Sequence, residues 1–326
     1  MSDKPMMSLS LDLDNKWSYL RTYGNPEWEQ YPSYLDLVCP RILDFFAERG
    51  IRITFFIVGK DAELDINRDA IASLARAGHE IGNHSFFHEP WLHLYTAEEF
   101  ESDLKRSEAA IEDVTGIRTS GFRGPGYSIT EMTLRVLKKN EYRYDATAFP
   151  NILNPLSRAY LFATTKLSKE EKKKRKALFG SFSDAFRPVK PYQWQLDDET
   201  LLELPVTTMP VFKTPIHFSY LTYLGMFSKP LAMAYLNVSI MMCRLTGTEP
   251  SLLLHPLDFM GKEDDEDLRD FPAMGLPLAR KLELMAAFVD RLCRSYTPVT
   301  MGEHVAHIAG TRTLRDYPPV FSSQSA

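Results

Sequence analysis

The chain has 326 residues and a formal net charge of −5, with 44% apolar and 25% charged residues. This composition excludes a disordered chain, a collagen-like fibre and a disulfide scaffold, and the negative charge argues against a nucleic-acid partner. The three cysteines (Cys39, Cys243 and Cys293) lie far apart without a C-x-x-C pair. This spacing gives no support for a zinc ribbon and favours a reducing compartment.

Two features of the sequence bear on its location. Residues 1–14 lack the basic segment and the long apolar segment of a signal peptide. No run of about 18 uninterrupted apolar residues occurs, which is the length that a transmembrane helix needs. We therefore expect a cytoplasmic protein without a membrane-spanning helix.

Strand and helix patterns alternate through the first half of the chain. Glycines follow several of the helical patterns, as at Gly50 and Gly116, and Thr96 with Glu99 forms a capping-box pattern. Strands are predicted at 7–13, 51–58, 79–83, near 122 and at 142–146, and helices at 34–48, 68–77, 96–116 and 130–140. Such alternation predicts a mostly parallel sheet, either closed as a barrel or open.

The alternation stops over residues 151–198, which contain the lysine-rich run 166–176. It then resumes to the end of the chain. Strands are predicted near 201–207 and at 251–254, helices at 229–245 and 276–295, and a last strand and helix within 297–308. We expect one domain over residues 1–326 with an insertion at about 151–198.

Two motifs contain residue types that bind metals. His84 and His88 are four residues apart after a predicted strand, so both rings can reach one ion from a single turn or a tight loop. Asp12 and Asp14 lie at the end of the first strand, where alternation places them on the same face. Each motif also has a simpler interpretation, namely surface or capping histidines and a solvated strand end.

Two further motifs lie near predicted strand ends. In the sequence 121–127 (GFRGPGY), two glycines and a proline after Arg123 fix the backbone, so that this arginine can orient a carboxylate. His255 ends the apolar strand 251–254, where barrel enzymes place catalytic groups. The simpler interpretations are an ordinary turn with an exposed arginine and a packed core histidine.

These four motifs, in this order, resemble those of the polysaccharide deacetylase family, carbohydrate esterase family 4. The resemblance spans about residues 8–258 and is most specific in His84-Ser85-x-x-His88 with the upstream aspartate pair. It implies an α/β fold, a distorted (β/α) barrel with seven strands. It also implies an N-deacetylase that acts on an amino sugar, a polysaccharide or a lipid-linked saccharide.

The resemblance further implies a role for each motif. Asp14, His84 and His88 would hold a divalent metal, zinc first, with cobalt, nickel and iron as alternatives. Asp12 would be the general base, Arg123 would hold it, and His255 would be the general acid. A backbone N–H near Gly126 would stabilise the oxyanion, with Tyr127 beside it.

The chain also departs from the common pattern of this family. Leu13 separates the two aspartates, and Gly126 stands where an aromatic residue is usual. The carboxylate that should tune His255 is missing from its usual motif, and Asp145, Glu203 and Asp258 are its candidates.

Aromatic residues follow the metal motifs. Trp17, Tyr19 and Trp91 are either walls for a sugar ring or packing at a barrel rim. His93, five residues past His88, is either a substitute ligand or a surface residue.

A basic and an apolar segment suggest a further partner. The run 166–176 is basic, and 216–245 is rich in Met, Leu and aromatic residues. Together they suggest peripheral contact with the inner face of an anionic membrane, although a buried helix pair is the alternative. Two other functions remain open. One is hydrolysis of a small non-sugar amide or cyclic imide, and the other is carbohydrate binding without catalysis.

Overall fold

The computed structural model describes residues 4–321 except 31, 90, 166, 175–184, 270, 272 and 320. Within these residues ten strands form one sheet in the order β10-β6-β7-β5-β4-β3-β2-β1-β8, and β9 pairs with β1. The strands are β1 (Met6–Leu13), β2 (Thr54–Ile57), β3 (Glu80–Asn83), β4 (Gly121–Phe122), β5 (Tyr144–Asp145), β6 (Tyr192–Leu196), β7 (Glu199–Glu203), β8 (Ser251–Leu254), β9 (Thr297–Val299) and β10 (Asp316–Tyr317).

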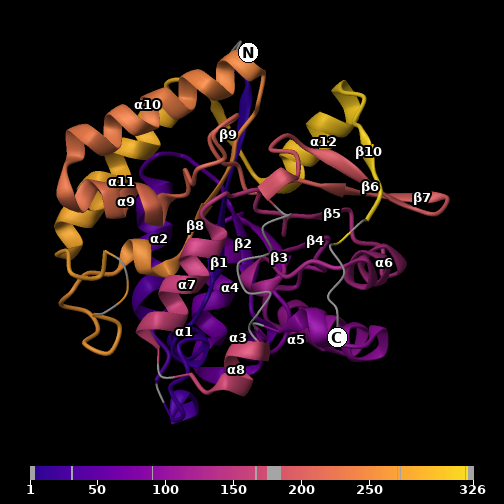
Figure 1. Cartoon of the computed structure of the whole chain (residues 1–326). Coiled ribbons are helices and arrows are strands. Elements are labelled where there is room, and N and C mark those ends of the chain that lie inside the picture. The colour runs from indigo at the N-terminus through magenta and orange to yellow at the C-terminus, as the bar shows by residue number, and fades with distance from the viewer. Residues whose placement is uncertain are drawn as a thin grey trace.

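Helices surround these strands, with α9, α10 and α11 on one flank and α5 and α6 on the other (Figure 1). The helices are α1 (Lys16–Thr22), α2 (Leu35–Ala47), α3 (Gly59–Glu63), α4 (Arg68–Arg76), α5 (Ala97–Thr115), α6 (Glu131–Lys139), α7 (Asn154–Thr164), α8 (Lys169–Lys174), α9 (Phe218–Phe227), α10 (Lys229–Thr246), α11 (Leu278–Cys293) and α12 (Met301–Thr311). The mostly parallel sheet agrees with the strand and helix patterns, and the architecture is the distorted (β/α) barrel that the family resemblance implies.

The barrel closes through an irregular segment rather than through a regular strand pair. Beyond β7, the N–H of Leu204 donates to the carbonyl of Asp145, and the N–H of Thr207 donates to the carbonyl of Ser251 at 2.8 Å. The chain therefore crosses from the β5 side to β8 without forming a ladder. The strands predicted from the sequence correspond to β1, β2, β3, β4, β5, β7, β8 and β9, whereas β6 and β10 were not predicted.

The alternating pattern of β1 separates an apolar face from a polar one. Leu9, Leu11 and Leu13 lie in the largest apolar cluster, which α2, α4 and α11 also line. On the opposite face, the hydroxyl of Ser8 contacts His304 at 3.0 Å. The barrel interior along β1 is thus lined by polar groups, and Asp12 belongs to this face.

Most predicted elements are present, and the capped ends agree well. The side-chain hydroxyl of Thr96 accepts the N–H of Glu99, and Gly116 ends α5 with a φ of 69°. The predicted insertion, residues 151–198, contains two helices and also one strand of the sheet. Asn154–Thr164 form α7 and Lys169–Lys174 form α8, but Tyr192–Leu196 form β6, which pairs with β7 in the sheet. Residues 166 and 175–184 lie outside the described residues.

Among the described helices, none is both long enough and apolar enough to cross a bilayer.

Candidate active site

The strand register brings the predicted motifs to one edge of the sheet. β1, β2, β3 and β4 are paired so that the last residues of β1, β3 and β4 lie in one row. The residues that come next are Asp14, His84 and Arg123. Leu11 of β1 pairs with Leu254 of β8, so His255 follows at the level of Asp12. Because the strands are parallel, these side chains share the carboxyl edge, where barrel enzymes place their chemistry.

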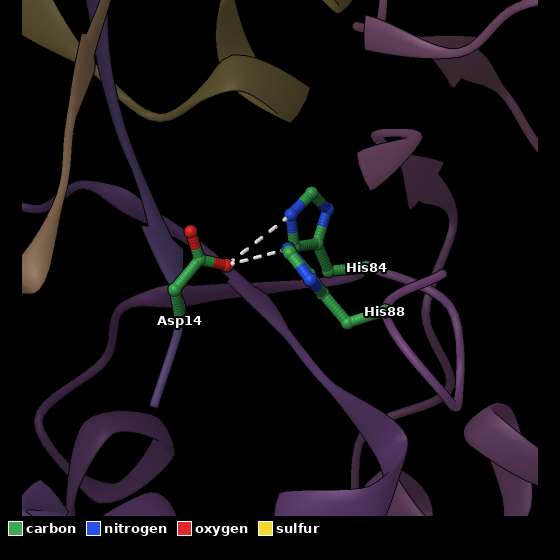
Figure 2. A group of neighbouring side chains, drawn as sticks. All are labelled: Asp14, His84 and His88. Atoms are coloured by element: carbon green, nitrogen blue, oxygen red, sulfur yellow. Dashed lines mark ion pairs between the residues drawn. The ribbon is translucent and has the colours of Figure 1, made fainter. Parts of the chain in front are cut away.

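Asp14, His84 and His88 converge on one point (Figure 2). The Oδ1 atom of Asp14 lies 3.0 Å from Nε2 of His88 and 3.5 Å from Nε2 of His84. All three side chains are buried, and one ligand atom from each lies within 4.8 Å of the others. One carboxylate oxygen and two imidazole nitrogens form a ligand set suited to zinc and to similar divalent ions.

The hydrogen bonds of these side chains fit a metal. Nδ1 of His84 lies 2.6 Å from the carbonyl oxygen of Arg123, so it carries the proton and leaves the lone pair of Nε2 facing Asp14. The buried Oδ1 atom of Asp14 has no hydrogen-bond donor. Burial raises the pKa of Asp14, but the rings of His88 and His84 outweigh burial and hold this pKa well below its usual range. A buried, ionised oxygen without a donor is what a cation satisfies.

The loop that carries both histidines is held in an uncommon backbone conformation. Ser85 and His88 have φ values of 62° and 49°, in the left-handed region that non-glycine residues rarely adopt. Neighbouring side chains hold this shape. Asn83 Oδ1 accepts the N–H of Ser85, and Asp103 of α5 accepts the N–H of Phe86 at 2.8 Å. Because strain of this kind persists only where the surroundings fix it, the loop is built to present the two rings.

Arg123 binds the other aspartate of the pair. Its Nη1 donates to Asp12 Oδ1 at 2.7 Å and to the hydroxyl of Ser10 at 2.9 Å, while its Nε donates to the carbonyl of Ala146. The guanidinium is fully buried and lies over the ring of Phe56. Arg123 therefore lies where the sequence analysis expects it, against the carboxylate of Asp12. The two aspartates therefore differ, because one faces an arginine and the other faces two imidazoles.

The loop after Arg123 turns back towards the same carboxylates. Gly126 and Tyr127 have φ values of 60° and 61°, and the N–H of Gly124 donates to the hydroxyl of Thr147 at 2.8 Å. Burial raises the pKa of Tyr127, and the carboxylates of Asp12 and Asp14 raise it further. Tyr127 therefore lies within electrostatic reach of the aspartate pair.

His255 meets a carboxylate through a serine. Its Nδ1 lies 3.2 Å from the hydroxyl of Ser219 in α9, and this hydroxyl donates to Asp258 Oδ2 at 3.1 Å. Asp258 also accepts the backbone N–H of His255. Of the three candidate carboxylates, the structure brings Asp258 to His255. Neither this relay nor Ser219 has a signature in the sequence, because α9 is distant from His255 along the chain.

Asp145 and Glu203 interact with each other instead. They are paired residues of β5 and β7 and are both buried. Glu203 accepts the indole N–H of Trp194 at 2.8 Å and the N–H of Ala148 at 2.9 Å, while Asp145 accepts the hydroxyl of Thr147. Burial and the neighbouring Glu203 raise the pKa of Asp145 well above its usual range. This pair supports the barrel and the loop that follows Arg123.

A further imidazole lies beside His255 and was not predicted. The ring of His217 lies 6.4 Å from that of His255 and 5.8 Å from Phe149, which packs on Tyr127 at 4.6 Å. Burial and the proximity of His255 lower the pKa of His217 to about 3, so this ring is neutral near pH 7. His217 also precedes α9 and accepts the N–H of Tyr220. A histidine just before an aromatic-rich helix was the signal available in the sequence.

The predicted aromatic walls lie at different distances from the site. Trp17 packs edge-on against the metal-site ring of His88 at 6.4 Å, but it is almost fully buried and its indole N–H donates to Asp61. Trp91 lies further out, under the guanidinium of Arg21 at 5.2 Å. His93 is not among the three converging side chains.

Comparison with known proteins agrees with this geometry. Residues 29–144 match the family model described as polysaccharide deacetylase. A peptidoglycan deacetylase of Helicobacter pylori is 26% identical over 162 residues, which cover 48% of this chain and 53% of that protein. A peptidoglycan-N-acetylmuramic acid deacetylase of Bacillus subtilis is 31% identical over 108 residues, which cover 32% of this chain and 39% of that protein. The chain spans about half, or less, of the length of these relatives.

The fold has a solved counterpart. A crystal structure from Mycobacterium smegmatis, described as a polysaccharide deacetylase, superimposes with a TM-score of 0.65 at 20% identity and covers 100% of this chain and 97% of its own. At this identity the likeness shows the fold alone. The family model and the curated relatives lead to one conclusion: over residues 29–144 the chain is similar to the polysaccharide deacetylase family, and it shares the fold of this solved structure.

Proposed function

We propose that the protein is a metal-dependent hydrolase that removes an N-acyl group, such as acetyl, from an amino sugar. The observation that carries this proposal is the unequal environment of the aspartate pair. Asp14 presents a buried oxygen without a donor to two imidazole nitrogens, while Asp12 is held by a buried arginine. The names of the relatives, which are peptidoglycan and chitin deacetylases, support an N-acetylated sugar as the substrate.

Asp14, His84 and His88 would hold the metal. When bound, the metal would act as a Lewis acid and lower the pKa of a water molecule that it binds. Zinc is the first expectation from these ligands, and cobalt, nickel and iron also suit them. Three protein ligands leave coordination positions for water and substrate, as hydrolytic sites require.

Asp12 accepts the proton of the attacking water. Its Oδ1 atom is occupied by Arg123, and its Oδ2 atom lies 3.9 Å from Nε2 of His84, on the side of the metal ligands. The ion pair with Arg123 holds the carboxylate in one orientation, which is what a general base needs. Arg123 is therefore a positioning residue.

His255, at the end of the neighbouring strand β8, donates a proton to the leaving amine. Its Nδ1 is held by Ser219, which Asp258 orients, so the Nε2 atom is left to meet the substrate. Gly126 and Tyr127 lie on the turn after Arg123, and a backbone N–H of this turn would bind the developing oxyanion. Hydrolysis of the amide then releases a carboxylic acid and the free amine of the sugar.

Metal analysis combined with an activity assay tests this proposal. We expect purified protein to contain one divalent ion and to release acetate from N-acetylglucosamine oligomers or peptidoglycan. His88→Ala should lose both the ion and the activity, because it removes one of three ligands. His93→Ala is the matched control and should keep both, since His93 lies outside the converging group.

Three results would count against the proposal. Wild-type protein that binds no divalent ion would remove the metal centre. A metal-loaded protein that hydrolyses a cyclic imide but no N-acetylated sugar would identify a different amide substrate. A metal-loaded protein that binds sugar oligomers without releasing acetate would identify a non-catalytic relative.

A further inference from the structure

Five large apolar side chains are exposed on three segments of the chain, near residues 152–156, 186 and 211–212. They form what we call the apolar lip: Ile152, Leu156, Phe186, Val211 and Phe212, which are 43%, 66%, 73%, 73% and 57% exposed. Monomeric proteins rarely expose apolar side chains of this size in a group without a function for them. The question is what covers the lip.

Hydrogen bonds hold three of these segments together. The backbone N–H of Ile152 donates to the carbonyl of Lys213 at 3.0 Å. The ammonium of Lys213 donates in turn to the carbonyls of Ala185 and Arg187, on either side of Phe186. The turn that bears Val211 and Phe212 is thus tied to both neighbouring segments.

The lip continues directly from the wall of the active site. Phe149, three residues before Ile152, packs against Tyr127 and His217. Its carbonyl accepts the side-chain amide of Asn154, the first residue of α7, which carries Leu156. A surface that covers the lip therefore lies next to the cluster of Phe149, Tyr127 and His217, whose last ring neighbours His255.

The charge of these segments is one-sided. Residues 146–169 and 204–217, which carry four of the five lip side chains, contain no Asp or Glu, although the chain carries 43 acidic residues among 326. They do contain Arg158 and Lys213. An acid-free apolar surface meets no repulsion from anionic headgroups, whereas the rest of this negatively charged protein does.

The tip of the lip has a strained backbone. Val211 has a φ of 72°, which is an outlier for a β-branched residue, and Lys213 has a φ of 51°. A glycine or asparagine would adopt this conformation at lower cost. Valine at this position disfavours the backbone conformation, and because its side chain is 73% exposed it does not contribute to the core. We interpret it as a side chain kept for contact with an apolar phase.

We propose that the apolar lip seats on the surface of an anionic phospholipid bilayer and brings the active site to a lipid-linked N-acyl amino sugar. The docking surface stands by itself, whereas the substrate class rests on the proposed function. This location differs from the one predicted by sequence, which joined 166–176 to 216–245. Figure 1 shows α8 and α10 at different ends of the molecule, so these two segments do not form one surface.

Vesicle co-sedimentation tests the surface. Wild-type protein should bind vesicles of equal parts phosphatidylglycerol and phosphatidylcholine, and bind pure phosphatidylcholine vesicles more weakly. The double variant Val211→Asn, Phe212→Ser should bind at least about tenfold more weakly, since it removes two inserting side chains. Asparagine tolerates the positive φ, so the variant should fold, and circular dichroism checks this. If it does not fold, Phe212→Ser alone serves.

Leu245→Asn is the matched control. Leu245 is 75% exposed on α10, but α10 leads to Glu249, which binds the N–H of Met6 at the amino end of β1, away from the site. This variant should bind vesicles like the wild type. Equal binding by the wild type and the lip variant would overturn the proposal, as would a loss of binding in Leu245→Asn alone. Dimers that dissociate in the lip variant would show a protein contact instead and would also overturn it.

Activity separates the two proposals. The lip variant should release acetate from short N-acetylglucosamine oligomers at the wild-type rate. It should lose at least about tenfold in rate on a lipid-linked N-acetyl sugar presented in the vesicles, in proportion to its weaker binding. Vesicle binding without any deacetylation would leave the docking surface intact and refute the proposed function. Deacetylation of oligomers without vesicle binding would refute the docking surface and leave the proposed function intact.

Discussion

Two aspartates separated by one residue acquire different chemistry from their neighbours. Asp12 and Asp14 are both buried and lie on the same face at the end of β1. The cation of Arg123 contacts the first, and the rings of His84 and His88 contact the second. Paired carboxylates in one site need cations beside them, because otherwise their repulsion would keep one of them protonated. Arg123 is that cation for Asp12, and a metal ion held with the two imidazoles would be that cation for Asp14.

Replacing the proposed base tests this division. Asp12→Asn keeps an oxygen that can accept from Arg123 but cannot take a proton from water. We expect kcat to fall about 10²–10⁴-fold, with the metal content unchanged. Metal analysis and acetate release on the same preparation check both. Activity close to that of the wild type would show that Asp12 is not the general base. Loss of the metal from the variant would show that Asp12 is a metal ligand.

The helix α5 supports the candidate metal site from outside it. Asp103 in its second turn holds the loop of His84 and His88 through the N–H of Phe86. The hydroxyl of Ser107, one turn later, donates to Asn83 at the end of β3. The helix begins with a capping box in which Thr96 and Glu99 satisfy each other's backbone N–H groups. Its first turn is solvent-exposed, so the cap acts on stability rather than on chemistry.

Removing this cap should lower stability modestly. Thr96→Ala leaves the N–H of Glu99 without its acceptor, which costs about 1 kcal/mol. For a domain of this size we expect the midpoint of thermal unfolding to fall by about 1–2 °C. Thr96→Ser, which retains the hydroxyl, should unfold like the wild type. A stability of Thr96→Ala equal to that of Thr96→Ser would show that the cap contributes nothing.

At the scale of the whole molecule, the barrel joins its two halves at a buried carboxyl pair. β5 and β7 meet at Asp145 and Glu203, and the chain then crosses to β8. Burial and Glu203 raise the pKa of Asp145 well above its usual range. A carboxyl group whose pKa is raised by folding contributes stability at low pH. That contribution disappears as the pH rises through the folded-state pKa.

The variant Asp145→Asn tests this pH dependence. Asparagine presents a neutral donor to Glu203 without titrating. We expect the variant to match the wild type below about pH 4, where the carboxyl group is protonated in both the folded and the unfolded chain, and to exceed its unfolding midpoint by about 2–4 °C at pH 8. Asp197→Asn is the control, because Arg135 lowers the pKa of that exposed group. Its unfolding midpoint should show no gain at high pH. Curves for Asp145→Asn that run parallel to the wild type would contradict the raised pKa.

Much of the barrel follows from local pattern. Period-2 alternation in β1, the capped helix α5 and the terminating glycines are visible in the sequence because they depend on neighbours along the chain. The strand β6 was missed, because its residues lie in a segment without clear periodicity and pair only with β7. The irregular closure between Thr207 and Ser251 likewise has no local signal.

The sequence by itself determined the residue types and their order at strand ends, and hence the group of Asp12, Asp14, His84, His88 and Arg123. Parallel strands must bring their carboxyl ends to one edge, so motif order was sufficient. Only the tertiary structure decided which carboxylate serves His255 and what lies beside it. Asp258 acts through Ser219, and His217 joins them, because α9 packs against the end of β8. Contacts between distant helices and strands depend on three-dimensional packing, for which linear spacing carries no signal.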